Sequence, residues 1–325
     1  MIVAISSFIA FILSVIAVFI VIKIDKKLKV GQPVLSYVDK HISKSGTPTF
    51  GGIGIVFSTI VCVLLFTRGS KSLALMCLAI TFAYGVVGFT DDFIKTRSNN
   101  NQGLSVKQKI IFQALISIII SIFAYKWVGT TLIIPFSLQV LDLGYFIIPY
   151  YIFVFLAFTN AVNLIDGLDG LAGKTSTAYL VFFALIIYFV SGINGAEEEN
   201  NLILFCVILA SSVLGFLLFN SYPAHIFMGD TGSLALGGAI GSLAVMSKLS
   251  LYAPIIGFVY VITCISDVIQ VAYYKKTKKR IFKMAPLHHH FEKQGVHENK
   301  IVSAYTLTTI YLGIICVGLT LFFNH

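Results

Sequence analysis

Residues 2–22 read IVAISSFIAFILSVIAVFIVI, a run without a charged side chain. A helix of about 20 apolar residues is long enough to cross a bilayer. The run is apolar on every face, whereas a membrane β-strand would alternate apolar and polar residues over about ten positions. This stretch therefore predicts a membrane-spanning helix and excludes a β-barrel.

The rest of the chain repeats this pattern. Of its 325 residues, 57% are hydrophobic and 11% are charged, with a mean hydropathy of +0.91, whereas about a quarter of a soluble domain is charged. We therefore predict a single all-α, polytopic membrane domain over residues 1–325, with about ten transmembrane helices. These helices are predicted near residues 2–22, 51–67, 72–90, 110–128, 144–163, 175–192, 202–219, 233–247, 253–273 and 304–323.

The charged residues predict the orientation of this domain. If the N-terminus lies outside, the inward loops carry 19 of the 23 Lys and Arg residues, and basic residues concentrate in cytoplasmic loops. We therefore predict both termini outside. The net charge of +9 is explained by this orientation in a lipid bilayer, so it does not indicate a nucleic-acid partner. Most acidic residues also fall inward, which places the predicted active site on the cytoplasmic face. The stretch from Thr130 to Leu143 predicts a small outside hairpin.

Two adjacent carboxylates, Asp91 and Asp92, follow the third apolar run. They repel each other unless a cation is present, which a divalent metal would supply. Lys95 lies one helical turn later, and Lys107 and Lys109 close the loop. A solvated cluster at a helix end is the alternative without a function.

A second polar cluster lies in NAVNLIDGLDGLAGKT, which begins at Asn160. The spacing of three puts Asn160, Asn163 and Asp166 on one helical face. An interhelical hydrogen-bond network would explain the asparagines, but not Asp166 and Asp169 among glycines.

The third and fourth clusters are FNSYPAHIFMGDTGS (219–233) and PLHHHFE (286–292). Asp230 lies at a predicted helix start, where backbone N–H groups favour an anion, although an ordinary N-cap would look the same. Three consecutive His residues, 288–290, point about 100° apart on a helix and do not suit one zinc ion. They can instead hydrogen-bond phosphates or carboxylates.

As a set, GTPTFGG (46–52), DDFIK (91–95), NAVNLIDGLDGL (160–171), FMGDTGS (227–233) and MAPLHHHFE (284–292) resemble the motifs of the polyprenyl-phosphate sugar-1-phosphate transferases. The PLHHHFE form is similar to the phospho-N-acetylmuramoyl-pentapeptide transferase (translocase I) branch. The resemblance implies a bacterial plasma-membrane enzyme, present as a homodimer. It would transfer phospho-MurNAc-pentapeptide from UDP-MurNAc-pentapeptide to undecaprenyl phosphate, forming lipid I and UMP for peptidoglycan synthesis.

The same resemblance implies roles for individual residues. Asp230 would be the chief Mg²⁺ ligand, with Asp92 as the second, and the Asp91–Asp92 pair would handle the nucleophile. Together with Lys95 and His289, these acids form the predicted catalytic set. The predicted substrate-binding residues are Lys44, Thr49, Asn160, Asn163, Asp166, Gly167, Leu168, Asp169, Asn220, Phe227, Gln270, His288 and His290, with Phe227 stacking on uracil beside residues 167–169.

Several alternatives remain open at this point. Direct attack by the acceptor phosphate is favoured over a covalent intermediate on Asp91 or Asp92, because positioning and charge stabilisation dominate phosphoryl transfer. A polyprenyl-phosphate GlcNAc-1-phosphate transferase is the nearest other enzyme. An ion-coupled transporter would also have about ten helices, but its polar residues should lie at mid-membrane rather than at one face.

Overall fold

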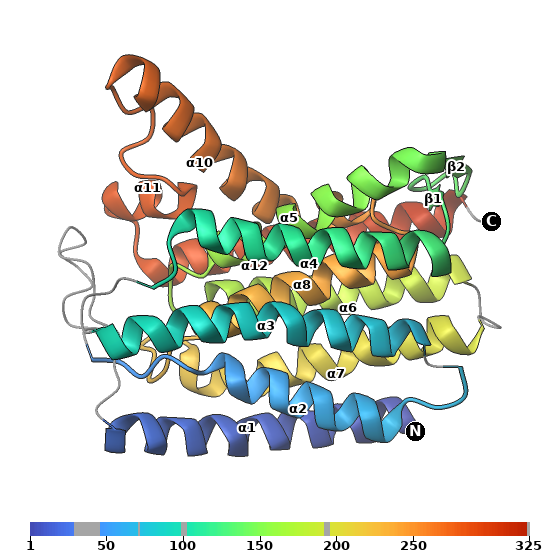
Figure 1. Cartoon of the computed structure of the whole chain (residues 1–325), viewed down its shortest axis with the longest axis horizontal. Coiled ribbons are helices and arrows are strands. Elements are labelled where there is room, and N and C mark those ends of the chain that lie inside the picture. The colour runs from blue at the N-terminus through green and yellow to red at the C-terminus, as the bar shows by residue number, and fades with distance from the viewer. Residues whose placement is uncertain (29–45, 71, 99–102, 192–195, 324–325) are drawn as a thin grey trace.

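The computed structural model describes residues 1–28, 46–70, 72–98, 103–191 and 196–323, which form a bundle of long, roughly parallel and antiparallel helices (Figure 1). Among these residues, seven helices are long and apolar enough to cross a membrane, which confirms a polytopic all-α protein. They are α1 (Ile2–Leu28), α3 (Ser72–Ser98), α4 (Val106–Trp127), α5 (Ile147–Ile165), α6 (Leu171–Ser191), α7 (Glu197–Asn220) and α12 (Glu298–Phe323).

The other three predicted spans are also helical, but each differs from a simple span. α2 (Gly52–Phe66) has 15 residues, about 22 Å of helix, which is shorter than the ~30 Å apolar core of a bilayer. The run at 253–273 is divided at Gly257 into α9 (Ala253–Ile256) and α10 (Phe258–Thr277). α8 (Gly229–Met246) is buried from Thr231 to its end, so protein rather than lipid surrounds it.

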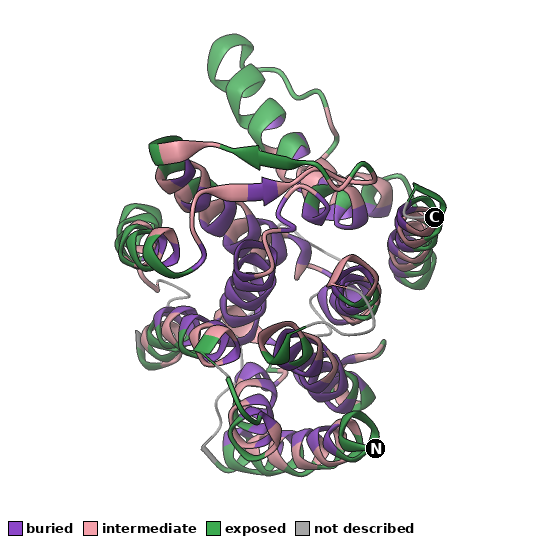
Figure 2. Ribbon diagram, turned by 90° about the vertical axis from the view of Figure 1, so that its right-hand side faces the viewer, coloured by how far each residue is buried: buried purple, intermediate pink, exposed green. Residues whose placement is uncertain are grey.

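Small residues allow α8 to occupy the centre of the bundle. A Cβ atom on Gly237 would lie 2.6 Å from Thr159 Cα of α5, and one on Gly238 would lie 2.5 Å from the Tyr84 ring of α3. Glycine therefore permits the close helix approach that membrane bundles use. Burial is concentrated on these central helices (Figure 2).

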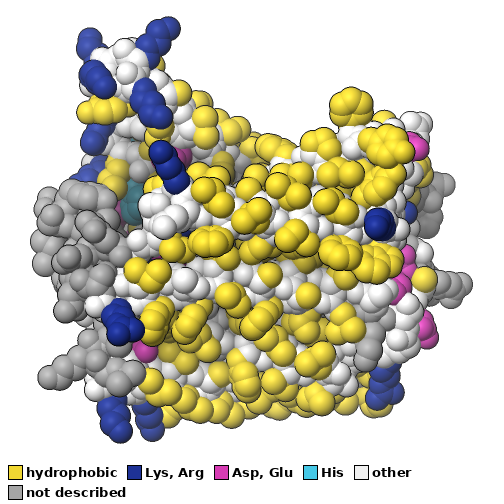
Figure 3. Space-filling view, viewed as in Figure 1, with side chains coloured by type: hydrophobic (Ala, Val, Ile, Leu, Met, Phe, Trp, Pro, Cys, Tyr) yellow, Lys and Arg dark blue, Asp and Glu magenta, His cyan; other side chains and the backbone are white. Residues whose placement is uncertain are grey.

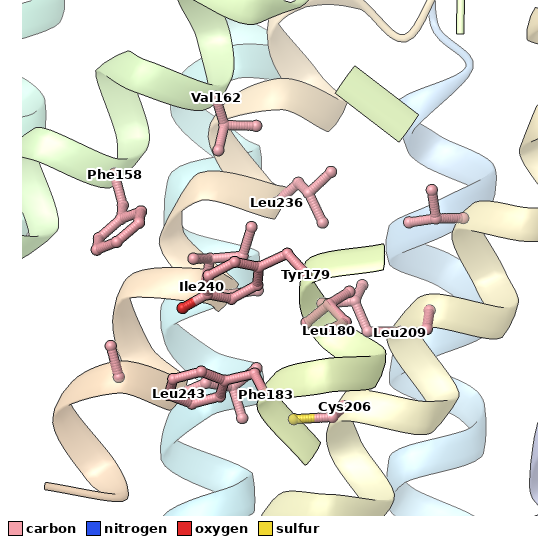
Figure 4. Close-up of a cluster of buried hydrophobic side chains, with 14 of the residues drawn as sticks. Phe158, Val162, Tyr179, Leu180, Phe183, Cys206, Leu209, Leu236, Ile240 and Leu243 are labelled. Carbon is pink, nitrogen blue, oxygen red and sulfur yellow. The ribbon is translucent and has the colours of Figure 1, made fainter. Parts of the chain in front are cut away.

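The apolar core fills the space between α5, α6, α7 and α8 (Figure 4). Tyr179 and Phe183 of α6 stack with ring centroids 5.3 Å apart, and the surrounding side chains interdigitate from the other helices. This cluster fixes the positions of the helix ends that carry the polar motifs. Its labelled members are Phe158, Val162, Tyr179, Leu180, Phe183, Cys206, Leu209, Leu236, Ile240 and Leu243.

The predicted hairpin is confirmed as the antiparallel pair β1 (Thr131–Ile133) and β2 (Val140–Asp142). It lies at the same end of the bundle as both chain ends, and a short 3₁₀ turn, η2 (Gly144–Phe146), leads from it into α5 (Figure 1). Exposed apolar side chains cover the face of the bundle seen in Figure 3, and the largest group of Lys and Arg lies toward the opposite end.

Candidate active site

Three carboxylates meet at the end of the bundle opposite the hairpin. Asp91 and Asp92 lie near the end of α3, and Asp230 lies in the first turn of α8. One oxygen from each lies within 4.8 Å of the others. Asp91 and Asp92 are almost completely buried. Chain segments 138 residues apart therefore form one acidic cluster, which could hold a metal ion.

Two lysines bridge this acidic cluster. Lys95 Nζ lies 2.6 Å from Asp91 Oδ2 and 2.9 Å from Asp230 Oδ2. Lys109 Nζ, from α4, lies 2.8 Å from Asp91 Oδ2 and also contacts Asp230 Oδ2. Lys109 was not among the predicted site residues. Lys107 and Lys109 lie two residues apart, so the sequence alone does not show which of them reaches the cluster. In the structure Lys107 lies on an exposed face of α4, whereas Lys109 is half-buried.

Asp92 caps the N-terminus of α8. Its Oδ1 accepts the Asp230 N–H at 3.1 Å, and its Oδ2 accepts the Thr231 N–H at 2.8 Å and the Thr231 hydroxyl at 2.7 Å. Gly229 has a φ of +73°, and a Cβ there would lie 2.6 Å from Asp92 Oδ2. Glycine is therefore required both by the backbone conformation and by the approach of the carboxylate.

The asparagines of the second motif separate into two roles. Asn163 Nδ2 donates to Asp230 Oδ1 at 2.8 Å and to Ser233 Oγ at 2.9 Å, so it joins the acidic cluster. Asn160 Nδ2 donates to Gln113 Oε1 of α4 at 2.8 Å. The structure thus places Asn160 in an interhelical hydrogen bond, the arrangement that was the alternative to substrate binding.

The loop 166–170 lies between α5 and α6 and is held by buried polar side chains. Asp169 Oδ2 accepts the Ala224 N–H at 3.0 Å, and the Asp169 N–H donates to Glu298 of α12. Asn220 accepts the Gly170 N–H at 3.1 Å and donates to the Ile226 carbonyl at 2.9 Å. Asn220 and Asp169 therefore join the glycine-rich loop to the segment that leads to Asp230.

The GTPTFGG segment pairs with the segment before Asp230. The Phe227 N–H donates to the Pro48 carbonyl at 2.8 Å, and the Gly51 N–H donates to the Phe227 carbonyl at 3.0 Å. This pairing leaves the Phe227 side chain half-buried. The Thr49 hydroxyl is buried without a hydrogen-bond partner, 3.1 Å from where a Cβ on Gly229 would lie. Lys44, the other predicted residue of this region, lies outside the described residues.

The His tract forms the short helix α11 (Leu287–Lys293). A Cβ on Gly167 would lie 2.5 Å from His288 Nε2 and 2.9 Å from His289 Nε2, so both rings lie against the glycine-rich loop. His289 Nδ1 lies 3.0 Å from Glu292 Oε2. His290 instead accepts the Lys283 N–H at 3.0 Å, which directs its ring toward the preceding loop.

Side chains of α10 hold the segment that leads into α11. Gln270 Oε1 accepts the N–H groups of Ile281 and Phe282, and its Nε2 donates to the Phe282 carbonyl, at 3.0–3.1 Å. Ser266 Oγ accepts the Leu287 N–H at 3.0 Å. The amide of Gln270 is thus used in bracing this segment. Its predicted contact with a substrate stays a prediction.

Two side chains near the glycine-rich loop have strongly shifted pKa values. Burial, followed by the negative charges of Asp230, Asp92 and Asp169, raises the pKa of Asp166 to about 8. Burial and the neighbouring His289 hold the pKa of His288 well below its usual range. His288 is fully buried, and neither of its ring nitrogens has a hydrogen-bond partner. Strongly shifted pKa values and a buried side chain without a hydrogen-bond partner are both typical of functional sites.

The sequence of this protein is similar to those of known proteins. Glycosyl transferase family 4 matches residues 74–248. A phospho-N-acetylmuramoyl-pentapeptide-transferase of Thermoanaerobacter sp. (strain X514) is 45% identical over 303 residues, 93% of each chain. The proteins of that name from Clostridium novyi (strain NT) and Clostridium perfringens (strain 13 / Type A) are 42% and 43% identical, covering 95% and 93% of this chain and 94% and 93% of their own.

Proposed function

The chain belongs to the phospho-N-acetylmuramoyl-pentapeptide-transferase family, within glycosyl transferase family 4, and from that premise we propose its substrates. The donor is UDP-MurNAc-pentapeptide, the acceptor is undecaprenyl phosphate, and the products are lipid I and UMP. The observation that carries this proposal is the cluster of Asp91, Asp92 and Asp230 with two bridging lysines, beside a glycine-rich loop lined by His288 and His289.

The acceptor needs little activation by the protein. A phosphate monoester has its second pKa near 6, so it is mostly a dianion at pH 7. An acceptor oxygen attacks the β-phosphorus of the donor, the bond from that phosphorus to the bridging oxygen breaks, and UMP leaves with that oxygen. The harder problem is the meeting of two anions. Lys95, Lys109 and the N-terminus of α8 provide positive charge at the place where negative charge concentrates.

The acidic cluster fits a hard divalent cation. Its donors are all carboxylate oxygens, which Mg²⁺ prefers, and it contains no thiolate or imidazole. With three carboxylates and two bridging lysines, the cluster keeps a net charge of −1. Asp230 would hold Mg²⁺, with Asp92 or Asp91 as a second ligand, and the ion would neutralise the pyrophosphate. Asn163 orients Asp230 through its 2.8 Å hydrogen bond.

The donor nucleotide is proposed to bind between the glycine-rich loop and Phe227. The half-buried Phe227 ring offers a surface for stacking, and its backbone is fixed three residues before Asp230. With uracil stacked there, the pyrophosphate of the donor would reach the acidic cluster. Because Gly167 has no Cβ, His288 and His289 can lie against the loop. These two side chains would contact the sugar-phosphate part of the donor.

The orientation in the membrane is part of the same proposal. Both termini and the hairpin are proposed to lie outside, with the acidic cluster at the cytoplasmic face of the bacterial plasma membrane. A thiol reagent that does not cross membranes should label Tyr145→Cys in intact cells and Lys276→Cys only after permeabilisation. Both positions are exposed, and the opposite labelling pattern would reverse the orientation.

The substrates are tested by incubating the purified protein with undecaprenyl phosphate and either UDP-MurNAc-pentapeptide or UDP-GlcNAc. UMP and a lipid-linked product are expected from the first donor. Efficient use of UDP-GlcNAc would instead support the GlcNAc-1-phosphate transferase alternative. The predicted homodimer is tested separately by the mass of the protein in detergent.

A further inference from the structure

The far end of α10 carries a concentrated group of basic residues. From 268 to 291 the sequence contains six Lys and Arg residues and no acidic residue. All six are exposed, and among the described residues none forms a salt bridge with an acid. We call them the α10 basic tip: Lys275, Lys276, Lys278, Lys279, Arg280 and Lys283. They do not take part in the acidic cluster.

α10 holds this tip away from the bundle. The helix leans away from its neighbours, and its end stands clear of the other helices (Figure 1). Dark blue side chains crowd that projection in the space-filling view (Figure 3). The tip is nevertheless toward the same end of the bundle as the last turn of α3. It therefore lies at the level of the polar helix ends, to one side of the bundle (Figure 1).

One flank of α10, before the tip, is apolar and exposed. Ile265, Val268, Ile269 and Val271 are each between 42% and 66% exposed. Because seven of the described helices are long and apolar enough to cross a membrane, we expect acyl chains to cover this surface. A helix whose apolar flank lies among acyl chains and whose end is basic places its cations at the headgroups.

The geometry points to the α10 basic tip as a binding site for anionic phospholipid headgroups of the surrounding bilayer. Charge complementarity selects the partner, because the tip offers six cations without an acid among them. The favourable free energy per cation near an anionic leaflet is large enough to enrich such lipids locally. The site is separate from the proposed transferase reaction and does not depend on it.

The only Trp of the chain makes a local test possible. Trp127, at the end of α4 beside the hairpin, is replaced by Phe, and Tyr274→Trp places the reporter next to the tip, where Lys278 Nζ lies 5.9 Å from the Tyr274 ring. The full-length variant is reconstituted in phosphatidylcholine vesicles. Its fluorescence is quenched with brominated phosphatidylglycerol or, at the same mole fraction, with brominated phosphatidylcholine.

The anionic lipid should be preferred by about fivefold if one lysine contacts each headgroup, and by about thirtyfold if two do. Replacing Lys275, Lys276, Lys278 and Lys279 with Gln should bring the preference close to one, and 0.5 M salt should weaken it. Lys26→Gln with Lys27→Gln, a matched pair of exposed lysines on α1, should leave it unchanged.

Equal quenching by the two lipids in the protein with an intact tip would overturn the inference. So would a preference that survives the four substitutions, because the cations would not be its cause. If undecaprenyl phosphate alone, and not phosphatidylglycerol, competes for the reporter position, the tip serves the acceptor and the phospholipid assignment is wrong.

Discussion

The substitution Asp92→Asn tests whether Asp92 caps α8 or mainly binds metal. The carboxylate accepts three hydrogen bonds from Asp230 and Thr231, at 2.7–3.1 Å. An Asn side chain keeps one acceptor oxygen and turns its NH₂ group toward a backbone donor. Loss of one charge-assisted hydrogen bond costs about 1.5–3 kcal/mol, and loss of the charge at a helix N-terminus adds about 0.3–1 kcal/mol.

We therefore expect Asp92→Asn to lower the free energy of unfolding by about 2–4 kcal/mol. At roughly 2–4 °C per kcal/mol, the melting midpoint in detergent should fall by about 4–16 °C. Thr231→Val removes only the hydroxyl bond and should have a smaller effect. The double variant should lose less stability than the sum of both, because the two groups share one interaction.

Asp267→Asn, on α10, removes a carboxylate outside the acidic cluster and is the matched control. It should melt close to the unmodified protein. If Asp92→Asn also melts at the unmodified temperature, or if its effect adds fully to that of Thr231→Val, the capping role is wrong. Asp92 would then act in the site chiefly as a metal ligand, as the sequence-based hypothesis has it.

Three further predictions concern the site. Lys109→Gln should reduce the transfer rate by about 10²–10³-fold, because it removes one of two cations that bridge Asp91 and Asp230. Lys107 is exposed, so Lys107→Gln should leave the rate close to that of the unmodified protein. Equal rates for the two variants would exclude the role of Lys109. Phe227→Ala should weaken UDP binding by about ten- to a hundredfold in calorimetry, and unchanged affinity would remove the stacking role. The pKa of His288 is lowered in the folded protein, so the unfolded chain binds the proton more tightly. Its contribution to stability should therefore be full above about pH 6.5 and fall as the pH drops below that value. His288→Gln should flatten this part of the profile of melting midpoint against pH, and a profile identical to that of the unmodified protein would contradict the assignment.

Hydropathy predicted the long helices of the bundle, but neither the short α11 nor the surroundings of each helix. The ten predicted ranges all contain a helix, because a long apolar run in a bilayer must satisfy its backbone hydrogen bonds internally. The break at Gly257 was not predicted, since apolar residues flank it on both sides. Nor does hydropathy distinguish α8, which protein surrounds, from a helix that faces lipid.

Local spacing predicted the acidic cluster only in part. Motif positions placed Asp91, Asp92 and Asp230 at one end of the membrane, and the structure brings them together. Spacing within one helix gave Asn160 and Asn163 the same role. Their partners, Gln113 and Asp230, belong to different neighbouring helices, so only tertiary packing separates the two asparagines. The same holds for His290, which lies about 100° around α11 from His289.

The most direct test of the central claim compares Asp230→Asn with the unmodified protein as magnesium is varied, using UDP-MurNAc-pentapeptide and undecaprenyl phosphate. The substitution keeps size and removes the charge on which two lysines and Asn163 converge. Release of UMP should depend on magnesium in the unmodified protein and fall by about 10³-fold or more in the variant, at saturating magnesium, while its melting midpoint shows that it still folds. Near-normal UMP release by a folded Asp230→Asn variant at low magnesium would contradict the assignment of this cluster as the catalytic centre.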